Sequence, residues 1–512
     1  MLVKTFGSAV FGIDATTITI EVNIDKGVNF TLVGLPDNAV KESHQRIKAA
    51  LINNGYKYPG KEITINMAPA DIRKEGSTFD LPIAIGLLAA SEQVSTSLLQ
   101  DYILLGELSL DGSLNPMKGI LPIALTAKNE GFKGIILPKD NVTEAAIVGG
   151  LDVYGVSNIQ EVIGFFNQTK KLEKTIVDVE KEFAQKLEEF NVDFKDVKGQ
   201  QNIKRAFEIA ASGGHNVVLI GPPGAGKSML AKRLPTILPP MSIDESLETT
   251  KIHSVVGKVD AKMGLVTNRP FRKPHHTISD VALVGGGGYP QPGEISLAHN
   301  GVLFLDELPE YKRNVLEVMR QPLEDRQVTI SRAKFTVDYP ASFMLVAAMN
   351  PCACGYYNHP DKDCICPPGG VKRYLSKISG PLLDRIDLHV EVTPVNFEEL
   401  AHHVPEEGSK EIRDRVIKAR IKQAKRFSDV SGLHNNAQMG SKELRKFCKI
   451  SDAGNAILKQ AMDGLGLSAR AYDRIIKVAR TIADLEESEA IETPHIAEAI
   501  QFRSLDRESW GE

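Results

Sequence analysis

The chain has 512 residues, of which 42% are hydrophobic and 25% charged, and its formal net charge is −4. This is the composition of a globular protein too long for one hydrophobic core, so we expect several domains, and its slight acidity means that any nucleic acid must be held by local basic loops. The longest apolar run, residues 81–90, is too short to cross a bilayer, and the first residues do not resemble a signal peptide. We therefore expect a cytoplasmic protein without membrane contact.

The first part of the chain, residues 1–168, alternates predicted strands with helices. Within residues 61–69, the apolar residues Ile63, Ile65 and Met67 recur at every second position, as in a strand, whereas residues 80–92 indicate a buried helix and residues 134–141 a further strand. Residues 169–193 are charged and poor in large apolar side chains. They are predicted to form a helical linker.

The middle part, residues 194–395, changes to a pattern of strand, glycine-rich loop and helix, with later buried strands at residues 301–306 and 342–350. This pattern predicts an α/β nucleotide-binding core. Helical periodicity then replaces the strands, so residues 396–512 are predicted to form a helical domain. Its basic segment 411–427 has an apolar stripe at Ile412, Val416 and Ile421, which favours an ordinary surface helix over a DNA-binding one.

A glycine-rich stretch follows the apolar strand at residues 216–220 and opens a helix, which is the context that a P-loop requires. Backbone N–H groups of such a loop enclose phosphate oxygens, the lysine reaches the β- and γ-phosphates, and the serine holds Mg²⁺. A simple glycine turn is the alternative. The predicted ATP-binding residues are Gly221, Pro222, Pro223, Gly224, Ala225, Gly226, Lys227, Ser228 and Asp306.

Residues 302–307, VLFLDE, form a second buried strand that ends in two acids. We predict that Asp306 and Ser228 hold Mg²⁺ and that Glu307 polarises the attacking water. A solvated strand end would look the same by itself, but the P-loop favours ATP hydrolysis.

Three further polar residues are candidates for catalysis. Asn350 ends the next buried strand, where its amide can position water beside the γ-phosphate, although an Asn before Pro351 can also start a turn. Arg385 and Arg470 lie in otherwise apolar helical surroundings. Each could supply charge in the transition state or be a structural arginine.

The string RPFRKPHHTISDVALVGGGGYPQPGEISLAHNGVLFLDELPE, together with MNPCACG and SARAYDRIIKVART, resembles the magnesium-chelatase-like AAA+ proteins of the ComM (YifB) family, and the resemblance covers essentially the whole chain. It implies an α/β fold with a three-layer AAA+ P-loop core, a helical lid at residues 396–512, and a hexameric ring with ATP between subunits. It also gives Asn350 the sensor-1 role, Arg385 the arginine-finger role on a neighbour's ATP, and Arg470 the sensor-2 role.

The same resemblance implies a DNA motor, a helicase that promotes branch migration of recombination intermediates in natural transformation. Its partner would be forked or branched DNA and single strands. The alternative is an ATPase motor for another substrate, such as the ATPase subunit of a metal chelatase. The two differ in partner and not in hydrolytic chemistry.

The family branch further implies an insertion in the second helix, matching residues 257–293, and a hairpin before sensor 1, matching residues 327–339. Alternating apolar residues support the hairpin. Because a slightly acidic motor must hold DNA with a few placed cations, we predict phosphate contacts at Arg332 and Lys334 of the hairpin, with Arg269, Arg272 and Lys273 as weaker candidates. The alternatives are a solvated hairpin tip and, for the second group, a role in the subunit interface.

Residues 1–168 resemble the proteolytic domain of Lon-like proteases, mainly in LGELSLDGSLNPMKGILPIAL and IILPKDNV. Where those enzymes have Gly-Pro-Ser-Ala, this chain has GSTF at residues 76–79, so Thr78 takes the place of the nucleophile and Leu121 that of the lysine. A hydroxyl without an activating base is a poor nucleophile. The domain is therefore predicted to be proteolytically inactive.

Four of the five cysteines form two CxC pairs, Cys352, Cys354, Cys364 and Cys366, in a proline- and glycine-rich insertion at residues 351–367. In a reducing cytosol, four clustered thiolates favour tetrahedral zinc over disulfides. His359 as a substitute ligand and reduced free thiols are the alternatives, since CxC is tighter than the usual CxxC.

Overall fold

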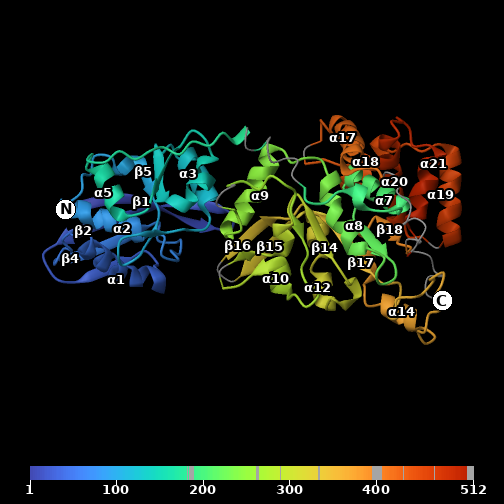
Figure 1. Ribbon diagram of the computed structural model, residues 1–512, viewed down its shortest axis with the longest axis horizontal. Helices are drawn as coiled ribbons and strands as arrows, with labels where there is room; N and C mark the ends of the chain where they lie inside the picture. Colours follow the sequence, from blue (N-terminus) through green and yellow to red (C-terminus); the bar gives the residue numbers. More distant parts are fainter. Residues whose placement is uncertain are drawn as a thin grey trace. The chain divides into compact units, whose positions relative to one another are not determined.

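The computed structural model describes residues 1–512 except 181–182, 184–189, 261–263, 289, 333–334, 395–405, 431, 466, 504 and 506–512. The chain divides into two compact units (Figure 1). The first consists of Met1–Leu187 with Ser242–Thr267, and the second of Glu188–Met241 with Asn268–Glu512. The sequence placed residues 242–267 within the ATPase core, whereas their contacts join them to the N-terminal unit.

The first unit is built on a seven-stranded sheet of order β3-β4-β2-β1-β5-β8-β9. Strands β1, β2 and β4 pair antiparallel, while β3 on β4 and the run β1-β5-β8-β9 are parallel. The strands are β1 (Leu2–Phe11), β2 (Asp14–Asp25), β3 (Phe30–Val33), β4 (Glu62–Ala68), β5 (Tyr102–Leu104), β8 (Gly134–Pro138) and β9 (Asp152–Val156), with a small hairpin of β6 (Glu107–Leu108) and β7 (Leu114–Asn115).

Helices cover this sheet as the hydrophobic pattern predicts. Every residue of α2 (Asp80–Ala90) is buried, and Ile63, Ile65 and Met67 of β4 are buried at alternate positions. Both predictions from periodicity are therefore confirmed. The other helices of residues 1–168 are α1 (Asn38–Asn53), α3 (Ile120–Asn129), α4 (Val142–Ala146) and α5 (Ile159–Phe166).

Helix α9 (Ile243–Val255) explains why Ser242–Thr267 belongs to the first unit, because it packs against α3. The Ser254 hydroxyl donates to the buried Glu144 carboxylate, and the Gly119 N–H donates to the Ser254 carbonyl at 3.0 Å. Glu144 also accepts from the Leu121 N–H at 3.0 Å. The start of α3 is thus held by residues that lie more than a hundred positions apart in the chain.

The second unit contains a five-stranded, fully parallel sheet of order β11-β14-β17-β10-β18. Its strands are β10 (Val217–Ile220), β11 (Phe271–Arg272), β14 (Val302–Leu305), β17 (Met344–Met349) and β18 (Leu388–Glu391). Helix α7 (Gln201–Gly213) packs on β18, and α8 (Lys227–Arg233) packs on β17. The carboxyl ends of parallel strands share one edge of the sheet, so the segments that follow them meet there.

Shorter helices follow the strands of this core. They are α10 (Asp280–Val284), α11 (Glu294–Leu297), α12 (Arg313–Glu317), α13 (Arg320–Asp325), α14 (Gly370–Leu375) and α15 (Gly380–Leu383). Two more pairs of strands occur, β12 (Gly285–Gly286) with β13 (Gln291–Pro292), and β15 (Gln327–Arg332) with β16 (Phe335–Pro340). The second pair is antiparallel and confirms the predicted hairpin, whose Val328, Ile330 and Val337 are buried. Lys334 lies outside the described residues.

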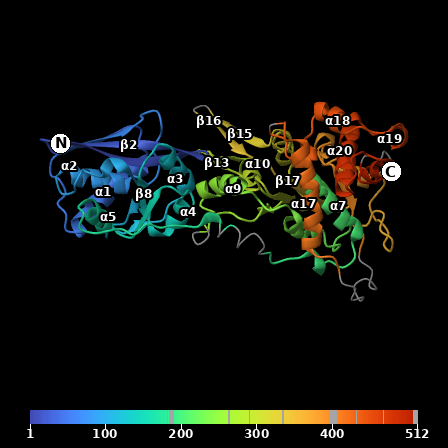
Figure 2. The same cartoon turned by 90° about the horizontal axis from the view of Figure 1, so that it is seen from above.

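The C-terminal part is helical, as predicted, with α17 (Ser409–Arg426), α18 (Ser441–Phe447), α19 (Asp452–Leu465), α20 (Ala469–Leu485) and α21 (Thr493–Gln501). Figure 2 shows α17 beside α7, against which it packs. Its buried face contains Ile412, Val416 and Ala419, but Ile421 is 63% exposed. The prediction that Ile421 joins the apolar stripe was therefore wrong, because the face that packs on α7 continues from Ala419 to Gln423. Among the described residues, no helix combines the length and apolarity that a membrane span needs.

Candidate ATP site and cysteine cluster

The predicted P-loop lies between β10 and α8, at the carboxyl edge of the parallel sheet. Gly221 allows a close approach, since a Cβ there would lie 2.3 Å from the Val392 carbonyl oxygen, and its N–H donates to the Met349 carbonyl at 3.2 Å. Gly226, the residue before α8, has φ of 82°, a left-handed conformation that glycine adopts without strain. Glycine is thus required at both ends of the loop for steric reasons.

Lys227 folds back over this loop. Its Nζ donates to the carbonyls of Gly221 and Pro222 at 2.6 and 2.9 Å and to Asn350 Oδ1 at 3.2 Å. Burial lowers the pKa of the Lys227 ammonium, and the negative charge of Asp306 opposes that shift. The structure therefore brings the predicted sensor-1 residue into direct contact with the P-loop lysine.

Asp306, directly after β14, receives two donors. The Ser228 hydroxyl donates to its Oδ2 at 2.6 Å, and Lys273 Nζ lies 2.8 Å from the same oxygen. Burial raises the pKa of Asp306, but the hydrogen bonds from Lys273 and Ser228 outweigh burial and leave the pKa below its usual range. An ionised carboxylate beside a hydroxyl is the kind of oxygen donor set that Mg²⁺ takes from proteins.

Glu307 follows with a left-handed backbone, φ 55° and ψ 49°. Such a conformation in a non-glycine residue costs on the order of 1–3 kcal/mol and is concentrated at functional sites. Its side chain is 60% exposed, with Oε2 3.2 Å from His276 Nδ1. The residue predicted to polarise water is thus accessible at the edge of the site.

The two predicted arginines lie near the loop between α15 and β18. Arg385 is 11% exposed; it pairs with Glu324 at 2.5 Å and donates to the Pro381 carbonyl at 2.6 Å. Arg470 is 67% exposed and pairs with Asp384 at 2.9 Å, next to Arg385 in the chain. The structure thus groups the two arginines around Asp384 and separately groups Lys227, Ser228, Asp306 and Asn350.

Helix α20 carries Arg470, and a buried ion pair attaches that helix to the sheet. Arg474 Nη1 lies 2.9 Å from Asp387 Oδ1, and Asp387 is almost fully buried. Burial raises the pKa of Asp387, but Arg474 and His215 outweigh burial and leave the pKa well below its usual range. Because Arg470 precedes Arg474 by one helical turn, the two arginines lie on the same side of α20, and Arg470 is the more exposed of the two.

The three weaker DNA candidates have partners within the chain. Arg269 donates to the carbonyls of Pro239 and Asn300, the Arg272 guanidinium binds the Glu294 carboxylate through two bonds of 2.6 and 2.7 Å, and Lys273 binds Asp306. Lys273 and His276 were not predicted from the sequence to be neighbours of the two acids. One signal was available: if β11 and β14 are adjacent parallel strands, the residues that follow them must share an edge.

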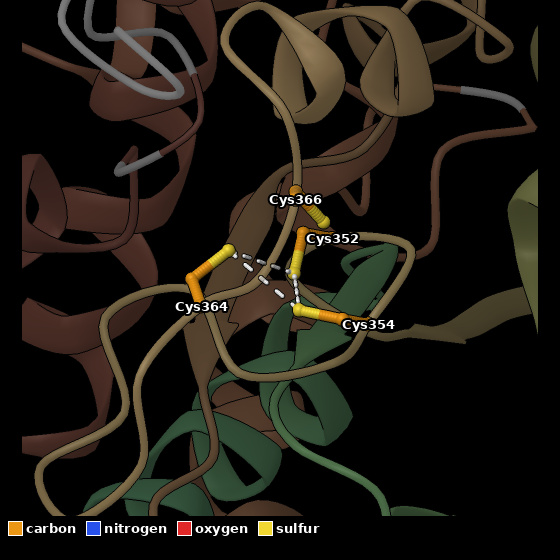
Figure 3. Close-up of side chains that lie close together, drawn as sticks. All are labelled: Cys352, Cys354, Cys364 and Cys366. Atoms are coloured by element: carbon orange, nitrogen blue, oxygen red, sulfur yellow. Dashed lines mark hydrogen bonds between the residues drawn. The ribbon is translucent and has the colours of Figure 1, made fainter.

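The four predicted thiols converge (Figure 3). Cys352 Sγ lies 3.3 Å from Cys354 Sγ and 3.8 Å from Cys364 Sγ, and the ligand atoms of all four, including Cys366, lie within 4.8 Å of one another. Tetrahedral zinc with Zn–S bonds of about 2.3 Å separates its sulfurs by about 3.8 Å. The spacing and the donor set therefore fit a closed zinc site. His359 is not in this group, and its Nδ1 accepts from the Asp361 N–H at 3.0 Å.

The thiols differ in acidity. Burial raises the pKa of the Cys352 thiol. At Cys354, burial opposes ionisation, but hydrogen bonds from the Tyr356 backbone and from Cys352 outweigh it and lower the pKa to about 6. At least one member of the cluster therefore ionises readily.

At the Lon-like positions, Leu121 is fully buried within the first unit, and the Thr78 carbonyl accepts from the Gly106 N–H at 3.2 Å. A buried leucine supplies no base where the resemblance would require a lysine.

A parallel sheet with a P-loop after one strand, an acid pair after another and a polar residue after the strand between them, followed by a helical domain, defines a P-loop ATPase of the AAA+ class. Models of the magnesium chelatase subunit ChlI match residues 193–400, 20–141 and, for its C-terminal part, 406–503.

Curated relatives cover almost the whole chain. It is 45% identical to the uncharacterized protein YifB of Escherichia coli, over 98% of this chain and 96% of that protein, and 44% identical to the competence protein ComM of Haemophilus influenzae, over 99% and 98%. Lon protease 2 of Bacillus subtilis matches 28% of the chain at 31% identity. The chain belongs to the ComM (YifB) family of magnesium-chelatase-like AAA+ ATPases, and this class implies ATP and Mg²⁺.

Proposed function

We propose that the protein is a hexameric, cytoplasmic ATPase motor that acts on DNA, a helicase that promotes branch migration of recombination intermediates in natural transformation. The observation that carries this proposal is the 44% identity, over nearly the full length of both chains, to a relative named competence protein ComM. The P-loop, the acid pair and the attached helical domain are the parts that such a motor needs.

In this proposal the P-loop and Lys227 bind the phosphates, Ser228 and Asp306 hold Mg²⁺, and Glu307 polarises water. Asn350 supports this assignment, since its amide contacts Lys227 beside the phosphate loop. Mg²⁺ neutralises charge on the phosphates and orients them for attack. Lys273 pairs with Asp306, and His276 Nδ1 lies 3.2 Å from Glu307 Oε2, so both acids have partners within the chain.

Two arginines complete the proposed site. Arg385 would act on the ATP of the neighbouring subunit and Arg470 as sensor 2, and both lie at the junction of the core with the helical domain. In a ring, Arg385 must exchange Glu324 for the neighbour's phosphate. That exchange is feasible because Glu324 is 56% exposed and water can replace the guanidinium.

The deciding experiment is a steady-state ATPase assay with and without forked and four-way DNA. The proposal expects that DNA stimulates ATP hydrolysis. An ATPase rate that stays the same with every DNA structure would contradict it. A second candidate is an ATPase that drives a metal-chelatase reaction. It is favoured by the match of three models described as chelatase subunit ChlI, and it expects no response to DNA.

The DNA contacts are proposed at Arg332, the last residue of β15, and at Lys334, which lies outside the described residues. The buried residues Val328, Ile330 and Val337 fix the hairpin to the core, and the cationic residues Arg332 and Lys334 could bind phosphates without reading sequence. Arg332→Ala with Lys334→Ala should keep basal ATPase but lose DNA stimulation and weaken the salt dependence of binding. Ser331→Ala, a neutral change in the same hairpin, is the matched control. Unchanged DNA stimulation in the double variant would place the contact elsewhere.

We also propose that the protein binds zinc, at one ion per chain, held by Cys352, Cys354, Cys364 and Cys366. Its support is the spacing of the four sulfurs. Metal analysis of protein purified without added zinc is the test, and a well-folded protein that contains no metal would contradict it.

A further inference from the structure

We propose that the four-cysteine cluster is a metal-dependent support of the ATP site, so that zinc at the cluster and nucleotide at the P-loop strengthen each other's binding. This inference rests on the zinc site and the ATPase function proposed above and adds a coupling between them.

The first cysteine pair follows directly on the ATP site. Cys352 lies two residues after Asn350, whose side chain accepts from Lys227 at 3.2 Å. Cys352 is fully buried, and its carbonyl accepts from the Gly355 N–H at 3.1 Å. The turn that carries Cys352 and Cys354 is therefore a continuation of the segment that contacts the P-loop lysine.

Gly355 brings this turn onto the P-loop itself. A Cβ at Gly355 would lie 2.6 Å from Cδ and 2.9 Å from Cγ of Pro223, so the bare backbone packs against the proline ring. Its φ of 87° is also left-handed, which favours glycine. A displacement of the turn therefore changes its contact with Pro223, one of the residues predicted to enclose the phosphates.

The second cysteine pair returns to the same place. Gly370 packs near Cys366, with a virtual Cβ 3.4 Å from the Cys366 Cβ, and it begins α14. That helix carries Tyr374, which is 8% exposed. Burial raises the pKa of the Tyr374 hydroxyl, which lies close enough to the Asn350 backbone for that backbone to lower the pKa in part. The chain thus leaves Asn350, passes through both cysteine pairs, and comes back to Asn350.

Residues 351–369, all of which the structure describes, form no helix or strand. A segment without a hydrogen-bonded ladder depends on cross-links for its shape, and binding of four thiolates by one ion supplies such a link between the two pairs. Loss of the ion would free both CxC turns. Because Gly355 and Tyr374 contact the P-loop and Asn350, this freedom would reach the phosphate site.

The test uses the full-length protein and measures binding instead of turnover. Titration with a fluorescent ATP analogue and Mg²⁺ compares the protein as purified, the protein after removal of metal by a chelator, and the same protein after addition of zinc alone. Removal of the metal should weaken nucleotide binding by about tenfold, and zinc should restore it, since coupling between sites is typically 5–150-fold. Coupling is reciprocal, so saturating nucleotide should tighten zinc binding by the same factor in a competition with a chelator.

A pair of glycine variants separates the contact from the metal. Gly355→Ala should keep its zinc and lose about tenfold in nucleotide affinity, because the new methyl group meets Pro223. Gly369→Ala is the matched control: its φ of 70° is also left-handed, it lies in the same segment 351–369, and nothing lies within 4 Å of its virtual Cβ. It should bind zinc and nucleotide as the unchanged protein does.

Three further outcomes would contradict parts of the proposal. If chelation removes the zinc and the folded protein binds nucleotide with unchanged affinity, the coupling is refuted but the metal site remains. Purified protein with four reactive thiols and no metal would refute the site itself, while the ATPase function would still be tested through Lys227. If metal removal unfolds the protein, Gly355→Ala carries the test, and normal nucleotide affinity in that variant overturns the proposal.

Discussion

Arg269 could either contact a DNA phosphate or act as a structural clamp that holds two segments of the second unit together, and the structure favours the clamp. Its Nε donates to the Pro239 carbonyl at 2.6 Å and its Nη1 to the Asn300 carbonyl at 2.7 Å. A hydrogen bond from a charged group contributes about 1.5–3 kcal/mol. The side chain is half-buried and water can replace part of each bond, so about 1.5 kcal/mol applies to each of the two bonds. Arg269→Ala should therefore lower the free energy of unfolding of the second unit by roughly 3 kcal/mol.

Two assays separate the interpretations. Urea unfolding followed by circular dichroism measures stability, and the transition of the second unit is recognised because only the unit with the P-loop is stabilised by nucleotide. DNA affinity as a function of salt measures phosphate contacts. We expect a large stability loss and an unchanged salt slope in Arg269→Ala, while Arg313→Ala, at an exposed arginine of the same unit, should change stability by no more than about 0.5 kcal/mol.

The opposite result would refute this reasoning. If Arg269→Ala unfolds like the unchanged protein and its salt slope falls by about one, the guanidinium contacts a phosphate and its carbonyl bonds contribute little. The hydrogen bonds of Arg269 also connect the two ends of an inserted segment. Pro239 comes shortly before Ser242–Thr267, the segment that belongs to the first unit, and Arg269 comes shortly after it. Arg269 therefore joins the segments of the second unit that precede and follow Ser242–Thr267.

Lys227→Ala is expected to abolish nucleotide binding, whereas Glu307→Gln should bind normally and stop turnover, because phosphate binding and water activation are separate steps. Binding of a fluorescent ATP analogue and steady-state phosphate release measure the two, and full turnover by Glu307→Gln would exclude its role. Arg385→Ala should bind ATP but hydrolyse it at least about a hundredfold more slowly, since an arginine finger stabilises charge of the transition state. Mixing it with Lys227→Ala should recover activity across the interface, and no recovery at any ratio would favour a purely structural pair with Glu324. Burial lowers the pKa of His389 well below the usual 6.5, so its contribution to stability is complete above about pH 6.5 and is lost as pH falls, by up to about 1.4 kcal/mol per pH unit. The free energy of unfolding, measured as the pH falls below about 6.5, should decrease with this slope. An equal slope in His389→Gln would assign the pH dependence to other groups.

Local spacing was sufficient for much of the fold and of the candidate site. Alternation in residues 61–69 predicted β4, and GPPGAGKS predicted a loop between a strand and a helix, because each pattern sets the backbone of the residues that carry it. Two CxC pairs close in sequence likewise predicted a cluster, and the four sulfurs converge.

Only the tertiary structure decided which distant segments meet. Lys273 and His276 reach Asp306 and Glu307 because β11 lies beside β14, and strand order is not encoded in local periodicity. The same holds for α9, which is surrounded in sequence by the ATPase core but packs on α3 of the first unit. Local patterns show which side of an element is apolar, but the surface that covers it is chosen by packing over the whole chain.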